Sequence, residues 1–212
     1  MNIRLDDTNT NSINLTVEFR FANGLSTEFH QTDEERVREA LHLLAAPTLF
    51  SHPHLLLGSQ LRASMIPCKG IDMILARTST PLPLEFPLKH PAGQFDFVAQ
   101  SIVRPDNKSA AIEDLGGKQG QPRGRSSQVE IHTLGGWTIT LEATAIFHGN
   151  ILDERQFFSQ LPNLPSIPFR LEEGGFGLIN TVNIVCVSAS PKPEGLPGIF
   201  LPLTCTDGFR RS

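Results

Sequence analysis

Two stretches of this 212-residue chain have the same order of residue types: IDMILARTSTPLP at 71–83 and VNIVCVSASPKP at 182–193. Each is an apolar run that passes through small hydroxyl residues into a Pro-x-Pro. A stretch that recurs after about 110 positions indicates an internal duplication, in which each copy is one supersecondary unit. The repeat constrains the fold because it predicts two halves with the same order of elements.

The first half begins with a predicted hairpin. LTVEFRF alternates apolar and polar residues, which is the period of a half-buried strand, and Asn23–Gly24 predicts a type I′ turn into LSTEFH. TDEERVREALHLL then predicts a helix with Thr32 as the N-cap and Glu35 completing a capping box. The apolar stripe predicted to pack on a sheet consists of Val37, Ala40, Leu41 and Leu44. Two strands follow, LLLGSQLRASMI and IDMILART.

The second half repeats this order. VEIHTLGGWTITLEATAIF predicts a hairpin that turns at Gly135–Gly136, and NILDERQFFSQLP predicts a helix with Asn150 as the N-cap. FRLEEGGFGLINTVNIVCVSASPKP predicts two strands that are joined near Glu173. Each half therefore reads as ββαββ.

These patterns predict an α+β fold, mainly antiparallel β, with two pseudo-repeated ββαββ halves at 13–103 and 129–212. Residues 1–12 form a polar tail, and 104–128 are a flexible linker or loop rich in Gly, Ser, Gln and charge. One helix covers only one face of each sheet, so the halves are expected to pack into one pseudo-two-fold body. Chance similarity of two α+β halves is the alternative, because the identities are few.

Composition excludes several function classes. The net charge of −4 is too mild to favour nucleic acid, and no apolar run reaches the roughly 18–20 residues that span a membrane. The N-terminus lacks the apolar segment of a secretory signal. Three widely spaced cysteines argue against a disulfide framework, so we expect a cytoplasmic protein.

His52 and His54 are the candidate metal ligands. In SHPHLLLG the two imidazoles fall on one side of an extended strand, as a metal site on a strand requires. A site needs a third ligand, and the other histidines are scattered along the chain. A polar loop that enters a strand is the favoured interpretation, and the sequence identifies no cofactor.

Cys68 and Asp72 are the candidate catalytic residues. Lys69 would lower the pKa of the Cys68 thiol if a turn exposed the sulfur, although an unreactive cysteine is the commoner case. Asp72 is a polar residue within an otherwise apolar run, as is Asn183 in the second run. An inward carboxylate must be paired or neutralised, which would make Asp72 functional, whereas an outward one is commoner on a half-buried strand.

Trp137 is the candidate binding residue, because it directly follows Gly136 at the edge of the second hairpin. It is either an interface anchor or a cross-strand packing residue. The glycine-rich DLGGKQGQPRGR, with Lys118 and Arg123, lacks the residue order of a phosphate loop and is interpreted as a solvated linker.

The sequence favours a non-enzymatic binding or assembly module whose partner is a protein, either itself, as in a homodimer, or another chain. The reason is that sheets with one helix each leave edges to be covered. The alternative is an enzyme or small-ligand carrier with a cleft between the halves, which would use His52, His54, Cys68 and Asp72. A structural component of a larger bacterial or phage assembly is the third hypothesis, with the linker ordering on contact.

Overall fold

The computed structural model describes residues 14–58, 63–86, 88–90, 93–104, 125–147 and 163–190. Among these residues no helix is both long and apolar enough to cross a membrane. The helix is α1 (Glu34–Leu44), and the short 3₁₀ turns are η1 (Leu49–Ser51), η2 (Cys68–Gly70) and η4 (Thr181–Asn183). The strands are β1 (Leu15–Phe21), β2 (Ser26–Gln31), β3 (His54–Gly58), β4 (Ala63–Pro67), β5 (Ile71–Thr78), β6 (Leu88–His90), β7 (Gly93–Val103), β8 (Arg125–Thr133), β9 (Thr138–Phe147), β10 (Ser166–Arg170), β11 (Phe176–Asn180) and β12 (Ile184–Ser190).

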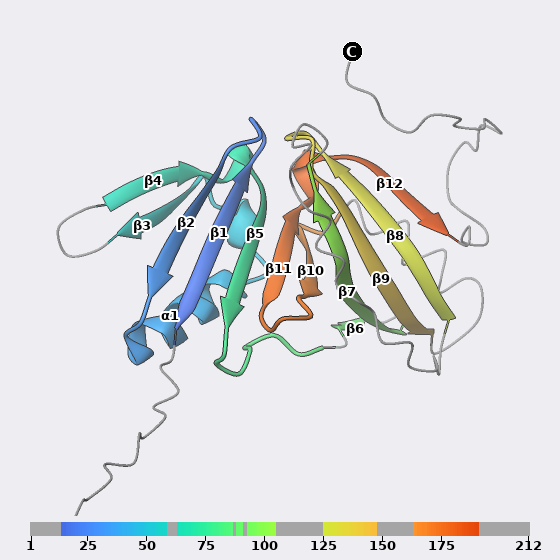
Figure 1. Ribbon diagram of the computed structural model, residues 1–212, viewed down its shortest axis with the longest axis horizontal. Coiled ribbons are helices and arrows are strands. Elements are labelled where there is room, and N and C mark those ends of the chain that lie inside the picture. The colour runs from blue at the N-terminus through green and yellow to red at the C-terminus, as the bar shows by residue number, and fades with distance from the viewer. Residues whose placement is uncertain are drawn as a thin grey trace, which may run out of the picture.

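Ten strands form one sheet in the order β12-β8-β9-β7-β10-β11-β5-β1-β2, with β6 beside β7 (Figure 1). The β3–β4 hairpin is a separate two-stranded sheet. Every pair is antiparallel except β10 with β7. The fold is therefore dominated by antiparallel sheet, and its two halves join edge to edge through β5 and β11.

The structure corrects the predicted elements at four points. LLLGSQLRASMI is the hairpin β3–β4 rather than one strand, and the last run gives three strands because η4 separates β11 from β12. β7, assigned above to the end of the first half, lies between β9 and β10 of the second. β8 begins at Arg125, inside the range assigned to the linker. The N-terminal tail, most of the linker and the predicted helix after Asn150 lie outside the described residues.

The first hairpin is confirmed, but its turn differs from the predicted type. The Gly24 N–H donates to the Phe21 carbonyl at 2.8 Å, and Gly24 has φ +80°. No described non-glycine residue has positive φ, so Asn23 does not meet the requirement of a type I′ turn. A three-residue loop that ends in a left-handed glycine replaces it. Gly136 repeats this geometry, with φ +80° and a 3.0 Å bond to the Thr133 carbonyl.

Helix α1 is confirmed, although Thr32 is not its N-cap. The cap is Asp33, whose carboxylate accepts a hydrogen bond of 3.0 Å from the Arg36 N–H. The Gln31 side chain accepts from the N–H groups of both Thr32 and Asp33, which holds the chain in position just before the helix. Of the predicted apolar stripe, the buried members are Val37, Leu41 and Leu44.

The pairing registers of the two halves correspond residue by residue. Val17 pairs with Ala76 in β1–β5, and Val129 pairs with Ala189 in β8–β12, so the spacings are 112 and 113 positions. Adding 112 to the β1 residue number and 113 to the β5 residue number of a pair gives a β8–β12 pair. All six β8–β12 pairs are obtained in this way, including the irregularity next to Phe21. The same spacings also convert the β3–β4 pairs into the five β10–β11 pairs.

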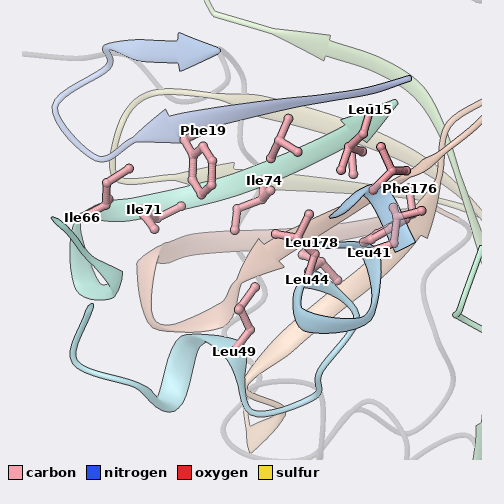
Figure 2. Packing of buried hydrophobic residues seen from close by; sticks show 13 residues of the cluster. Leu15, Phe19, Leu41, Leu44, Leu49, Ile66, Ile71, Ile74, Phe176 and Leu178 are labelled. Carbon is pink, nitrogen blue, oxygen red and sulfur yellow. The ribbon is translucent and has the colours of Figure 1, made fainter. Parts of the chain in front are cut away.

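Strand β5 contributes to two hydrophobic cores. Its Ile74 and Ala76 face the first core, which fills the space between α1, β1 and β11 (Figure 2). Its Met73 and Leu75 face the second core, built mostly from the second half. The labelled members of the first core are Leu15, Phe19, Leu41, Leu44, Leu49, Ile66, Ile71, Ile74, Phe176 and Leu178. The second consists of Met73, Leu75, Phe95, Phe97, Ala99, Val129, Ile131, Ile139, Leu141, Ile167, Phe169 and Ile179.

Candidate functional site

Asp72 is a fully buried carboxylate that joins the two halves. It lies at the start of β5, and its Oδ2 accepts hydrogen bonds from the Thr133 hydroxyl at 2.5 Å and the Gly135 N–H at 2.7 Å. Burial raises the pKa of Asp72, and the hydrogen bonds from Thr133 and Gly135, with the nearby Asn183 amide, only partly oppose this. Asp72 thus points inward, and its polar contacts belong to the second hairpin.

Two buried asparagines continue this polar joint. The Asn180 amide donates to the carbonyls of Cys68 at 3.2 Å and Ile71 at 2.9 Å. The Asn183 amide donates to the carbonyls of Lys69 at 3.1 Å and Ile71 at 2.9 Å. Side chains of the second half therefore satisfy main-chain acceptors at and beside the 3₁₀ turn η2 of the first half, where an unpaired carbonyl would be costly.

Trp137 contacts two arginines from other segments of the chain. The Arg20 guanidinium carbon lies 4.4 Å from the indole centroid and that of Arg104 lies 5.8 Å away, both within cation–π range. Arg104 also donates to the Gly24 carbonyl in the first hairpin turn. The indole therefore connects the two hairpin turns within one chain.

Cys68 is buried in η2, and its thiol donates to the Leu49 carbonyl at 3.7 Å. The condition for a reactive thiol, a sulfur exposed by the turn, is therefore not met. Burial raises the pKa of the Cys68 thiol. A nucleophilic cysteine needs a lowered pKa and access to substrate, so these surroundings are those of a packed thiol.

His52 and His54 are both exposed, at the end of η1 and the start of β3. Within the described ranges no three His, Cys, Asp or Glu side chains are grouped closely enough to hold a metal ion. The two histidines instead line a groove of ≈ 930 Å³ between β2, α1 and the β3–β4 hairpin. Its walls are mostly apolar, including Phe29, Leu55 and Leu57. No local sequence motif predicts this groove, because it forms between β2 and β3, which belong to separate sheets.

Four exposed apolar side chains lie on the β3–β4 hairpin and on β12, which have edges with which no described strand pairs. Leu56 of β3 and Met65 of β4 are 76% and 63% exposed, and Val185 and Val187 of β12 are 52% and 41% exposed. In the described part of the chain, β12 is the last strand of the large sheet and β4 pairs only with β3. Sequence reasoning missed this surface, because exposure depends on which strands stay unpaired.

Comparisons with protein-family models, with curated proteins and with solved structures find no match for this chain. Its geometry separates two kinds of feature. The polar groups Asp72, Asn180 and Asn183 are used in the joint between the halves. In the described part of the chain, the groove has mostly apolar walls and no strand pairs with the outer edges of β4 and β12.

Proposed function

We propose that the protein is a non-enzymatic assembly module that binds protein chains by adding strands to its open edges. The observation that carries this proposal is that β4 and β12 each have an edge with which no described strand pairs, and that exposed apolar side chains lie on β3–β4 and β12. Strand edges offer unpaired N–H and C=O groups to another extended chain, and neighbouring apolar side chains add affinity. We keep the cytoplasm as its compartment, in line with the free thiols of Cys68 and Cys186.

The surroundings of the catalytic candidates support a non-enzymatic role. The Oδ2 atom of Asp72 accepts hydrogen bonds from Thr133 and Gly135, and Cys68 is buried with a raised pKa. A small-ligand carrier is the second candidate, favoured by the apolar groove of ≈ 930 Å³, a volume typical of ligand pockets. Among the described residues, those that line the groove belong to the first half rather than to both halves.

We also propose that the chain arose by internal duplication. Support comes from the constant spacing of 112–113 positions between corresponding strand pairs, including the irregularity beside Phe21 and Thr133. The unit is one strand longer than ββαββ, because β3 and β4 are separate strands, as are β11 and β12. A two-fold arrangement has less support: it would pair β12 with β4 as β5 pairs with β11, and that pair does not occur among the described strands.

Photo-cross-linking in cells that express the full chain tests the binding role. A photoreactive phenylalanine analogue is placed at Leu56 or Val185 on the open strands, and at Leu25 as control, which is 64% exposed in the first hairpin turn. We expect protein adducts at the first two positions and few at Leu25. No adduct above the control, together with a small molecule retained in native mass spectra, would favour the carrier.

A further inference from the structure

The main-chain joint between the halves is the antiparallel strand pair β5–β11, which has a defined register. Leu178 of β11 lies opposite Ile74 of β5, and Phe176 lies opposite Ala76. Leu178 is 3% exposed and Ile74 is fully buried, both in the core beneath α1. The second half therefore adds its β10–β11 hairpin to the last strand of the first half.

Both strands of this joint have a counterpart at the spacing of 113 positions. β4 occupies in the first half the place that β11 has in the second, since the β3–β4 and β10–β11 registers correspond. β12 likewise corresponds to β5, since both pair with the first strand of a hairpin. β5 and β11 pair with each other, whereas their counterparts β12 and β4 are not paired with each other in the described structure.

If β4 pairs with β12 in the register of β11 on β5, exposed side chains of the two strands fall opposite each other. The counterparts of Leu178 and Ile74 are Met65 and Val187, which are 63% and 41% exposed. The counterparts of Phe176 and Ala76 are Ala63 and Ala189. Two apolar side chains left in solvent thus fall opposite each other, at the position where the joint within the chain buries two.

Charged side chains, which protect many edge strands from pairing, are absent from β4 and β12. β4 reads ASMIP and β12 reads IVCVSAS, so neither has a charged residue, and the only proline is the last residue of β4. β2, at the other end of the large sheet, carries Glu28 and His30. Charges on an edge strand discourage association, and their absence from β4 and β12 favours it.

We propose that a second copy of this chain occupies the edge: β4 of one copy pairs antiparallel with β12 of the next, in the register of β11 on β5. This inference rests on the proposed assembly function and names its partner. In Figure 1 β4 and β12 lie at opposite ends of the molecule, so one copy does not pair them with each other. The contact joins two different surfaces, and such head-to-tail contacts build rings or open filaments.

The test measures the mass of the untagged full chain in solution by sedimentation velocity and native mass spectrometry over a wide range of concentrations. We expect species larger than one chain for the wild type. Met65→Glu or Val187→Glu should each reduce the protein to single chains, because each places a buried charge in the joint. An equimolar mixture of the two variants should recover a species of two chains, because each variant retains one intact edge.

Leu25→Glu is the matched control, since it changes an exposed leucine outside both edges and should assemble like the wild type. Circular dichroism checks that each variant is folded, which the exposure of Met65 and Val187 leads us to expect. A wild type that stays a single chain at all concentrations overturns the inference, and so does assembly that survives both substitutions. If protein adducts still form at Leu56 in cells in that case, the binding function stands and the partner is another protein.

Discussion

At the scale of single residues, the joint between the halves depends on a glycine with no room for a side chain. A Cβ atom at Gly135 would lie 2.4 Å from the Phe21 carbonyl oxygen and 2.5 Å from the Asp72 Oδ2 atom. Both neighbours belong to the first half, and Asp72 also accepts the Gly135 N–H. Close approach, rather than backbone conformation, therefore requires glycine here, because Gly135 is not among the glycines with positive φ.

Gly135→Ala should lower the free energy of unfolding by about 1–3 kcal/mol, because overpacking forces the second hairpin turn away from Asp72. Gly70→Ala is the matched control: no atom lies within 4 Å of its Cβ position, so its stability should stay near that of the wild type. Urea unfolding followed by Trp137 fluorescence measures both. Equal stabilities of the two variants would mean that the turn moves without cost.

Sequence reasoning selected several residues of this joint but not their roles. Asp72 and Asn183 stood out as polar residues in apolar runs, and both are buried with hydrogen bonds across the halves. Their partners could not be predicted, because Thr133 lies 61 positions from Asp72 and the contact depends on how the hairpins meet. The cation–π contacts of Trp137 with Arg20 and Arg104 depend on the same long-range packing.

At the scale of elements, local patterns predicted the strands and the first helix, whereas the turns and sheet order depended on context. Alternation identified β1 and β2, and the apolar spacing identified the buried face of α1. The place of β7 in the second half could not be read from QFDFVAQSIV, since alternation fixes which faces a strand presents but not its neighbours. The cap of α1 was misassigned by one residue because Thr32 and Asp33 are both good caps.

The cap of α1 gives a prediction at this scale. Asp33→Ala should lower the free energy of unfolding by about 1 kcal/mol, because the Arg36 N–H loses its acceptor. Thr32→Ala should change it by less than about 0.5 kcal/mol, as is usual for exposed positions without a specific contact. Chemical denaturation of the two variants distinguishes the caps. A larger loss for Thr32→Ala would restore the capping box that the sequence suggested.

At the scale of the whole molecule, the halves share their central strands and are therefore not independent. β11 belongs to the second half by sequence, yet its Phe176 and Leu178 complete the core under α1 in the first half. β5 belongs to the first half, yet its Met73 and Leu75 lie in the second core. If one half unfolds, the core of the other half loses the buried side chains of a strand. Unfolding one half therefore also destabilises the other.

This sharing predicts a single cooperative unfolding transition, followed identically by far-ultraviolet circular dichroism and by fluorescence of Trp137, the only tryptophan. Met73→Ala and Ile74→Ala provide the sharpest comparison, since these neighbours on β5 are fully buried in different cores. Each should lower the free energy of unfolding by about 2–5 kcal/mol and move the one transition as a whole. Two separate transitions, each shifted by only one of the variants, would mean that the halves fold independently and merely adhere through β5 and β11.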